Sequence, residues 1–301
     1  MQQVLASKDP SVVLPQRGLL GILLELSKAR LSGLALFTAL VGFWLGSGSE
    51  ISRLLLLHTL IGTAALAAGA AALNQYLERE HDAKMPRTQG RPLPSGHLKP
   101  ETALILGGAS SGFGLIYLAL FTNLLTSLIG AITIVVYLAV YTPLKRVTVL
   151  NTIVGAIPGA LPPLMGWTAA RGELTMQGWA LFLILFFWQL PHFLAIAWLY
   201  RDEYAGAGFC MLPLIDPSGM RTGRQALSHT LGLFAISLAP FVYRLVGSIY
   251  LAGAFLLGLS FLYFAFQFAR LRSSTEARKL FYFSIIYLPL LLGLMIADKL
   301  R

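Results

Sequence analysis

Three polar residues follow one another at helical spacing directly after a long apolar run. Asn74, Glu78 and Asp82 occupy positions i, i+4 and i+8 after the apolar segment 54–73. On an α-helix, residues at this spacing lie on one face, each about 40° round from the last. One amide and two carboxylates would therefore point in the same direction from the end of a helix.

The segment that follows this acidic face supplies cations. Pro86 disfavours helix at the residue before it, so we expect the helix to end near Lys84 and a loop to carry Arg87 and Arg91. Mg²⁺ prefers a few carboxylates together with substrate phosphate oxygens, and the planar guanidinium of arginine matches phosphate geometry. The pattern predicts a site for a diphosphate bound through Mg²⁺. The alternative is a solvated helix end with ordinary i,i+4 ion pairs.

The composition of the chain indicates the surroundings of this face. The 301 residues are 56% hydrophobic and 12% charged, with a mean hydropathy of +0.71, whereas soluble domains carry roughly 25% charged residues. Many apolar runs reach the ~20 residues that a helix needs to cross a bilayer. The sequence therefore predicts an all-α polytopic membrane protein within the lipid bilayer. The single cysteine, Cys210, excludes an internal disulfide and a multi-cysteine metal site.

The apolar pattern predicts one transmembrane domain over residues 18–301, preceded by a polar tail, 1–17, that we expect to be a disordered cytoplasmic segment. Residues 18–27 have the pattern of an amphipathic or partly inserted lead-in. We predict nine spanning helices, of which the second and sixth are long enough to extend into water. Their expected ranges are 31–48, 54–80, 101–121, 124–141, 150–169, 175–200, 225–243, 247–269 and 280–298.

The positive charges are distributed unevenly along this arrangement. With a cytoplasmic N-terminus, all but five of the 23 Lys and Arg residues fall in or beside cytoplasmic segments; the five are Arg53, Arg171, Arg244, Lys299 and Arg301. Cytoplasmic loops of membrane proteins are enriched in such cations, so the asymmetry predicts that the N-terminus is cytoplasmic. The same enrichment accounts for the net charge of +10, and we expect no nucleic-acid partner.

The fourth predicted span ends in a second group of polar residues. Tyr141 is followed by Pro143, which we expect to break the helix and to leave Lys145 and Arg146 at the cytoplasmic face. The two cations either anchor the helix at the membrane surface or form a second phosphate clamp.

The fifth and sixth predicted spans have features of a cavity wall. Residues 151–167 are rich in Pro and Gly, so we expect a kinked or partly unwound span. Irregular backbone persists in a membrane only when it is buried in protein or lines a cavity. The sixth span carries Trp188 and His192 on one face near its middle, where an ionisable residue is usually functional. His192 either hydrogen-bonds a neighbouring helix or acts near a large ligand.

A second acidic cluster follows the sixth span, where Arg201, Asp202, Glu203 and Tyr204 stand together. Two acidic clusters, several cations and an apolar interior suit a substrate with an anionic head and an apolar tail, such as a prenyl diphosphate. Mg²⁺ would make the diphosphate a better leaving group. The allylic carbocation would lie in a dry cavity, where aromatic faces stabilise cations and quenching by water is restricted.

The same residues resemble the motifs of the UbiA-type intramembrane prenyltransferases. The likeness extends over residues 25–297 with the motifs in matching order. The runs 141–146, 151–167 and 188–198 resemble in particular a branch whose members farnesylate haem. The first acidic motif of the family is matched by Asn74, Glu78, Asp82, Met85, Arg87, Thr88, Arg91 and Pro92.

The resemblance implies a reaction and a set of roles. The enzyme would ionise farnesyl diphosphate and join its C1 to a vinyl group of haem b. Water would then add to the haem-side cation and give the hydroxyethylfarnesyl group of haem O. Asn74, Glu78 and Asp82 would bind the Mg²⁺–diphosphate, and Asp202 and Glu203 would form the second metal cluster.

The remaining roles concern the phosphates and the haem. Tyr141 would stabilise the allylic cation or orient the leaving group, and Trp188 and His192 would lie on the haem side. Arg201 and Tyr204 would complete the substrate-binding set. The phosphate oxygens would be contacted by Lys84, Arg87, Arg91, Lys145 and Arg146.

Two positions depart from the family pattern. The family usually has Asp where this chain has Glu78, and the extra methylene shifts the expected metal geometry. The general second motif has two aspartates four residues apart, but Asp202 is followed at that distance by Gly206. The haem branch commonly has an acid just before the tyrosine, which favours Glu203 as the matching position.

Two other functions remain open at this point. A UbiA-type enzyme that acts on another aromatic acceptor, such as a hydroxybenzoate, would share the diphosphate site, although such an acceptor gives no reason for His192. A transporter of anionic lipids would carry charges at the membrane midplane and inverted repeats, whereas most charges here lie at one face. The resemblance places the enzyme in the bacterial cytoplasmic membrane, with a haem A synthase or a terminal oxidase as a potential recipient of the product.

Overall fold

The computed structural model describes residues 18–48 and 50–300, so the tail predicted over residues 1–17 lies outside the described part. The described residues form helices joined by loops, of which 83–99 is the longest, and their one β-bridge pairs Val246 with Lys299. The helices are α1 (Leu19–Leu26), α2 (Ala29–Gly46), α3 (Arg53–Asp82), α4 (Pro100–Phe121), α5 (Leu124–Val135), a π-helix (Val136–Tyr141), α6 (Thr142–Leu144), α7 (Asn151–Arg171), α8 (Met176–Leu199), α9 (Arg201–Gly206), a short 3₁₀ turn (Leu212–Leu214), α10 (Met220–Ser237), α11 (Ala239–Val242), α12 (Ser248–Leu271) and α13 (Ser274–Ala297).

Nine segments of the described chain are helical, long enough and apolar enough to cross a membrane, which confirms the predicted all-α polytopic fold. Two helices begin earlier than predicted: α10 begins at Met220 rather than at 225, and α13 begins at Ser274 rather than at 280. Both extra turns contain charged residues, which a search for apolar runs leaves out. Ser273 caps α13 by accepting a hydrogen bond from the backbone N–H of Glu276 (3.2 Å).

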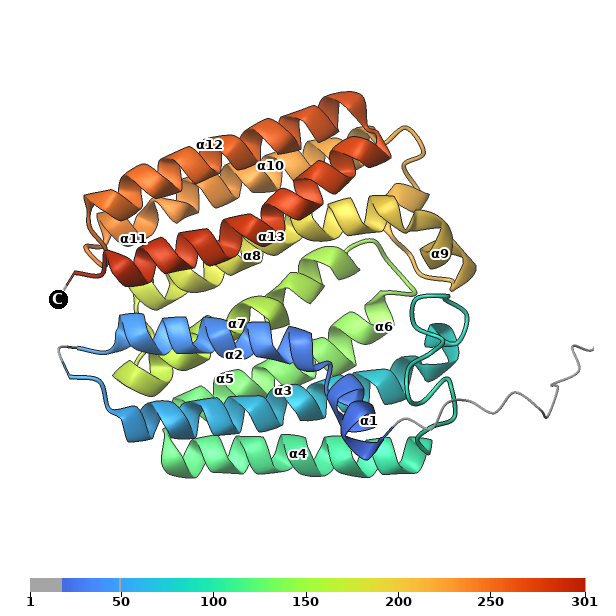
Figure 1. The fold of residues 1–301 in the computed structure, drawn as a ribbon, viewed down its shortest axis with the longest axis horizontal. Coiled ribbons are helices and arrows are strands. Elements are labelled where there is room, and N and C mark those ends of the chain that lie inside the picture. Colours follow the sequence, from blue (N-terminus) through green and yellow to red (C-terminus); the bar gives the residue numbers. More distant parts are fainter. Residues whose placement is uncertain (1–17, 49, 301) are drawn as a thin grey trace, which may run out of the picture.

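The spanning helices lie side by side, with α7 and α8 in the interior and α4 and α12 on opposite outer sides (Figure 1). α7 is buried over most of its length and remains one continuous helix through Pro158, Pro162 and Pro163. Of the two alternatives predicted for this span, kinked or partly unwound, the second is therefore wrong, and the kink stays a prediction. Proline is tolerated here because surrounding groups in a membrane protein satisfy the backbone groups that it leaves free.

The interior of the molecule is made of large side chains from the C-terminal half. Trp167, Tyr250, Phe261, Phe268 and Tyr287 are among the largest fully buried side chains, and they belong to one apolar cluster that joins α7 to the last helices. This cluster fixes α8, which carries several of the predicted site residues, against a rigid support.

One end of the bundle holds α1, the loop 83–99, α6 and α9 (Figure 1), and we call it the polar end. α1 exposes Leu19, Leu20 and Leu24, as expected of a helix that lies in the membrane surface. Gln75 of α3 donates hydrogen bonds of 2.9 Å to the carbonyls of Glu25 and Leu26, which hold α1 in place.

The opposite end of the bundle carries the C-terminus and α11 (Figure 1). Arg53 begins α3 and Arg171 ends α7, so these two of the cations assigned to the outer side lie away from the polar end. The cytoplasmic placement of the polar end stays a prediction.

Candidate active site

The polar face of α3 is buried. Asn74, Glu78 and Asp82 are at most 3% exposed, although they lie in the last turns of a helix that reaches the polar end. Carboxylates are almost never buried unless they are paired, and a buried carboxylate that loses its partner is strongly destabilising. The α-helical period therefore brings the three residues together as predicted, and their burial makes partners obligatory.

Each carboxylate is paired with a cation from another segment. The Nζ of Lys145, just after α6, donates to Oε1 of Glu78 (2.7 Å), and Nη1 of Arg91, in the loop 83–99, donates to Oδ2 of Asp82 (2.6 Å). Burial alone lowers the pKa of Lys145, but Tyr141 and Glu78 raise it by more, so its pKa lies above its usual value. Lys145 is therefore a permanent ammonium group beside the acidic face.

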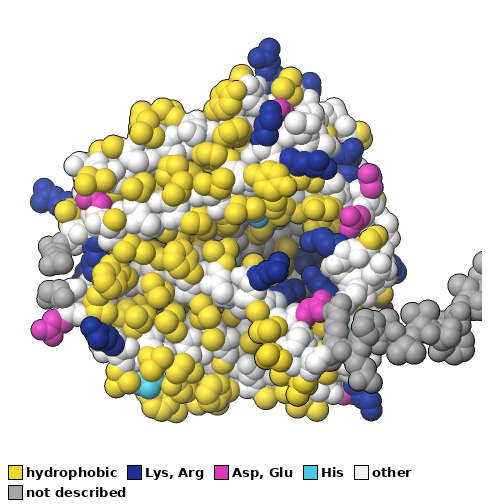
Figure 2. Space-filling model, in the orientation of Figure 1, with side chains coloured by type: hydrophobic (Ala, Val, Ile, Leu, Met, Phe, Trp, Pro, Cys, Tyr) yellow, Lys and Arg dark blue, Asp and Glu magenta, His cyan; other side chains and the backbone are white. Residues whose placement is uncertain are grey.

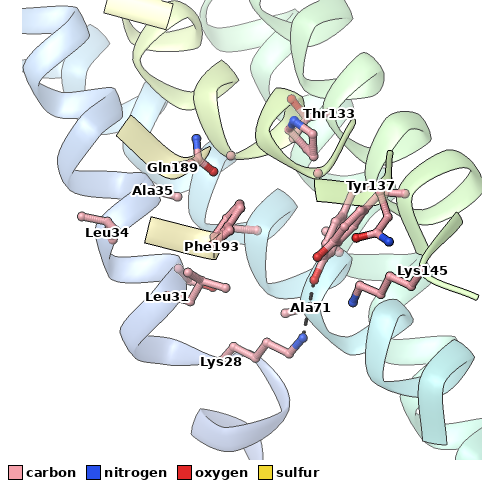
Figure 3. A pocket seen from close by; sticks show the side chains of 18 of the residues that line it. Lys28, Leu31, Leu34, Ala35, Ala71, Thr133, Tyr137, Lys145, Gln189 and Phe193 are labelled. Carbon is pink, nitrogen blue, oxygen red and sulfur yellow. Dashed lines mark hydrogen bonds between the residues drawn. The ribbon is translucent and has the colours of Figure 1, made fainter. Parts of the chain in front are cut away.

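Lys28 is a further cation at this face that the sequence analysis did not single out. It joins α1 to α2 in the left-handed region (φ 47°), and its Nζ donates to Oδ1 of Asn74 (2.6 Å) and approaches the hydroxyl of Tyr137 (3.5 Å; Figure 3). Burial and the nearby Arg91 lower the pKa of Lys28 to about 7. The sequence signal was its position between two apolar helices, where a lysine that merely anchors a helix in the membrane surface looks the same.

The backbone around Lys145 is held by the segment that follows α9. The N–H of Cys210 donates to the carbonyl of Lys145 (2.6 Å), and the side-chain amide of Asn151 donates to the carbonyl of Cys210 (2.6 Å). The Lys145 ammonium also lies 5.9 Å from the ring centre of Phe209. These contacts direct Lys145 inward, toward Glu78.

Two tyrosines line the wall beside Lys145 because of a local change of helix type. The fourth span continues beyond α5 as a π-helix that contains Tyr137 and Tyr141. A π-helix has more residues per turn than an α-helix, and such turns occur frequently at functional sites. The two rings stack with centres 5.8 Å apart, and the Nζ of Lys145 lies 4.5 Å from the Tyr141 ring centre. A side chain on Gly155 of α7 would occupy the place of the Tyr141 ring.

A cavity of about 530 Å³ extends from this polar cluster into the apolar interior. Its wall is formed by α2, α3, the π-helix, α7 and α8, and side chains from several of them converge on one space (Figure 3). Figure 2 shows a mostly hydrophobic face that is hollowed near its centre, with lysine and arginine side chains gathered beside the hollow. The predicted site residues that line the cavity are Glu78, Asp82, Arg87, Arg91, Tyr141, Lys145, Trp188, His192 and Tyr204.

Arg87 and Tyr204 close the polar mouth of the cavity from two elements. Arg87 donates from Nη2 to the hydroxyl of Tyr204 in α9 (3.3 Å), and its guanidinium lies 5.4 Å from the ring centre of Tyr200. Met85 and Phe209 pack in one apolar cluster below them. The loop 83–99 and α9 are therefore joined above the cavity.

Several predicted phosphate contacts lie outside the cavity. Lys84 is exposed, and Arg146 is exposed with Nη2 donating to the carbonyl of Leu77 (3.4 Å). Arg201 donates to the carbonyl of Trp198 (3.1 Å) and lies 5.0 Å from the Trp198 ring centre. None of the three cations is among the residues that line the cavity.

The second acidic cluster differs from the first. The side chain of Asp202 is 97% exposed and lies 4.0 Å from Arg201. Glu203 has a buried Oε2 that has no hydrogen-bond partner in the described part of the chain. Neither residue lines the cavity.

The donor set at the mouth fits Mg²⁺ that is bound together with a substrate. Glu78 and Asp82 supply carboxylate oxygens, but the described residues contain no cluster of three or more His, Cys, Asp or Glu that could hold a metal by themselves. Mg²⁺ usually takes one or two carboxylates and completes its shell with water and substrate phosphates. Two buried carboxylates beside several cations match that requirement.

Trp188 and His192 lie deeper in the cavity and are fixed by α13. The Nε1 of Trp188 donates to the carbonyl of Ser284 (2.7 Å), and Nδ1 of His192 lies 2.7 Å from Oγ of the same serine. The His192 ring is stacked between Trp188 and Phe281, at 5.2 and 5.0 Å. The structure thus shows both a hydrogen bond to a neighbouring helix and a position on the cavity wall.

The fold and the cavity are those of an intramembrane prenyltransferase. The model of the UbiA prenyltransferase family matches residues 35–287, and the chain belongs to this family. Among curated relatives, the chain is 48% identical over 285 residues to the protoheme IX farnesyltransferase of Solibacter usitatus, which covers 92% of this chain and 98% of the relative. It is 40% identical over 270 residues to the mitochondrial protoheme IX farnesyltransferase of Arabidopsis thaliana, covering 89% of this chain and 63% of that one.

Solved structures agree with the fold. A digeranylgeranylglyceryl phosphate synthase aligns with a TM-score of 0.80 at 20% identity, covering 93% of this chain and 98% of that one. A UbiA homologue from Archaeoglobus fulgidus bound to GPP and Mg²⁺ aligns with a TM-score of 0.65 at 14% identity, covering 91% and 99%. Membership of a prenyltransferase family decides against the transporter interpretation.

Proposed function

We propose that the protein transfers the farnesyl group of farnesyl diphosphate to a vinyl group of haem b and that water addition completes haem O, with release of diphosphate. The observation that carries this proposal is one continuous cavity with buried carboxylates and cations at its mouth and aromatic and aliphatic side chains within. The relatives named protoheme IX farnesyltransferase support the choice of haem as acceptor.

The mouth of the cavity holds the diphosphate in this proposal. Arg91 and Lys145 already point at the acidic face, so they can donate to phosphate oxygens with little movement. Arg87 also lines the cavity, where it donates to the hydroxyl of Tyr204. Mg²⁺ bound by Glu78 and Asp82 would neutralise the diphosphate and improve it as a leaving group.

The proposal for the second acidic cluster rests on one residue. Glu203 is the α9 residue that we propose as an additional metal ligand, because its buried Oε2 has no partner among the described residues. The exposed side chain of Asp202 gives no support for the same role. Lys84, Arg146 and Arg201 would reach the phosphates only if their side chains turned toward the mouth.

The wall below the mouth serves the carbon chain and the acceptor. Tyr137 and Tyr141 present stacked rings beside Lys145, and aromatic faces stabilise a developing allylic cation. Trp188 and Phe193 line the α8 side, where a flat apolar macrocycle can pack. An apolar wall also keeps water away from the cation until the new carbon–carbon bond has formed.

The fold and the relatives support a proposal about the surroundings of the reaction. We propose the bacterial cytoplasmic membrane as the location, with the polar end in the cytoplasm where farnesyl diphosphate is soluble. The product is apolar and stays in the bilayer, so a membrane-bound haem A synthase or terminal oxidase is the recipient that we propose.

The test uses the full chain in lipid nanodiscs with haem b, farnesyl diphosphate and Mg²⁺. Mass spectrometry should detect haem O in this sample. It should detect none when EDTA is added or when the Asp82→Asn variant replaces the unchanged chain. Prenylation of a hydroxybenzoate or a naphthoate, with haem b left unchanged, would overturn the haem assignment and leave the family assignment in place.

A further inference from the structure

Two polar side chains of α8 lie in the cavity and are not used by the diphosphate site. Gln189 and His192 are three residues apart and therefore share a face of the helix, and both line the cavity. Their hydrogen bonds determine which of their atoms remain available to a bound molecule.

The tautomer of His192 follows from its serine partner. Oγ of Ser284 donates its hydrogen to the carbonyl of Phe281 (2.6 Å), so toward Nδ1 of His192 (2.7 Å) it can act only as an acceptor. In the neutral ring Nδ1 therefore carries the hydrogen and Nε2 carries a lone pair. The ring faces are covered by Trp188 and Phe281, and the edge with Nε2 is the part left to face the cavity.

The orientation of the Gln189 amide also follows from its hydrogen-bond partners. Its nitrogen lies between two carbonyl oxygens, those of Ala156 (3.3 Å) and Leu185 (3.1 Å). Both partners are acceptors, so the atom between them is the NH₂ group and both of its hydrogens are used. Oε1 then lies over Gly159, where no side chain competes for the space, and it accepts no hydrogen bond from the described residues.

The α8 face thus offers two hydrogen-bond acceptors, Oε1 of Gln189 and Nε2 of His192. A water molecule, which has two O–H donors, can bind to both. We propose that Gln189 and His192 bind the water that adds to the haem-side cation and that Nε2 of His192 takes its proton. This inference rests on the proposed function, because the water has a role only if a vinyl group is alkylated.

The bonds and charges of this step balance without a further reactant. The vinyl π electrons form the bond to farnesyl C1, and the vinyl carbon attached to the porphyrin becomes positive. The water oxygen uses a lone pair to form the C–O bond, and one O–H bond breaks as its proton moves to Nε2 of His192. Overall, farnesyl diphosphate, haem b and water give haem O, diphosphate and one proton.

Gln189 and His192 lie at the depth at which farnesyl C1 should meet the vinyl group. Glu78 lies four residues before the end of α3 and His192 lies seven residues before the end of α8. At about 1.5 Å per residue, Glu78 lies about 6 Å and His192 about 10 Å below the ends of their helices. C1 is directly bonded to the diphosphate, so its acceptor should lie just below the acidic face, near the level of His192.

The experiment measures how the farnesylated haem is divided between two products. Without a base for the water, the cation should instead lose a proton from the former terminal vinyl carbon, which is now bonded to farnesyl C1, and give an alkene that is conjugated with the porphyrin and lighter than haem O by one water. For the His192→Ala variant in nanodiscs, we expect this alkene to be the larger share of the farnesylated haem that forms, whatever the total amount. Isotope-labelled water should enter the product of the unchanged chain and much less of the variant's product.

A matched control is available in the same membrane. His58 of α3 also contacts a hydroxyl, that of Tyr117 (2.8 Å), and stacks on Phe121 (4.9 Å), but it does not line the cavity. The His58→Ala variant should keep the hydrated product. If the unchanged chain farnesylates no haem at all, the proposed function fails rather than this inference.

Three results would overturn the inference. The first is a His192→Ala variant that still gives hydrated product in the usual share. The second is a folded variant that makes no farnesylated haem and whose bound haem has an altered absorption spectrum, because His192 would then be an iron ligand. The third applies if His192→Ala does not fold. The Ser284→Ala variant removes the group that keeps the hydrogen on Nδ1 of His192, so it should raise the share of alkene. An unchanged share of alkene would contradict the role of His192 as base.

Discussion

Neighbouring residues in this protein can have opposite surroundings, and Lys145 and Arg146 are an example. Lys145 is partly buried and contacts Glu78 and Tyr141, whereas Arg146 is exposed and contacts a backbone carbonyl. The sequence offered both as phosphate ligands, because adjacent cations after Pro143 cannot be told apart by type. The direction of each side chain depends on Cys210, which holds the backbone of Lys145 from a distant segment.

This contrast gives a prediction with a built-in control. A hydrogen bond to a charged group contributes about 1.5–3 kcal/mol, and 1.4 kcal/mol is a factor of ten. We expect Lys145→Gln to lower kcat/KM for farnesyl diphosphate by roughly 10- to 150-fold. Arg146→Gln should change the same ratio by less than about threefold, since surface cations contribute little. Equal losses in steady-state assays would show that both cations contact the phosphates.

The α-helical period allowed the acidic residues of α3 to be found from the sequence. Site residues that lie where this period is interrupted could not be found in the same way. Asn74, Glu78 and Asp82 follow one continuous helix, so spacing alone placed them together. Lys28 reaches the site because the chain breaks between two helices. Tyr137 reaches it because the helix there has a π turn, and no local pattern in the sequence predicts that change.

At the scale of elements, the nine spans were predictable because apolar length is the main requirement for crossing a bilayer. The first turns of α10 and α13 were not, since they depend on caps and on charges beyond the apolar region. α10 shows this most clearly. Asp216, in the loop before it, accepts hydrogen bonds from the N–H and the hydroxyl of Thr222 (2.8 and 2.9 Å).

The Asp216 cap gives a pH-dependent prediction. Burial alone raises the pKa of Asp216, but hydrogen bonds from Thr222 and Ser218 lower it by more, so its pKa lies below the ordinary value of 3.8. Its contribution to stability is therefore present above about pH 4 and is lost as the pH falls through the lowered pKa. We expect Asp216→Asn to cost about 1 kcal/mol at neutral pH and progressively less in acid. Thermal unfolding in detergent at several pH values checks this, and a pH-independent difference would be the contrary result.

The crossing of α2 and α7 gives a prediction about packing. A Cβ at Gly42 would collide with the backbone carbonyl of Pro163, and one at Gly166 would collide with that of Ala39. Backbone atoms cannot turn aside as a side chain can, so we expect Gly42→Ala and Gly166→Ala each to destabilise the protein by about 1–3 kcal/mol. Gly108→Ala on α4 is the control, because nothing lies within 4 Å of its Cβ position. Unfolding temperatures lowered equally in all three variants would argue against a specific crossing.

At the scale of the whole molecule, the separation of cations between the two ends predicts one orientation in the membrane. In a Cys210→Ser background, Gln89→Cys marks the polar end and Glu173→Cys marks the opposite end. We expect an impermeant thiol reagent on intact cells to label the second variant and to leave the first unlabelled until the membrane is permeabilised. The reverse pattern would place the polar end outside.

The last spanning helix, α13, and the residues after it contact elements that form the earlier part of the site. Near the C-terminus, Lys299 donates to the carbonyls of Trp44 and Ser47, both at 2.7 Å, and Ser284 of α13 fixes Trp188 and His192. These contacts cannot form until α13 and Lys299 have been synthesised. A nascent protein that lacks them would therefore possess the acidic face of α3 but not the finished cavity wall, so the last helix controls when the site is complete.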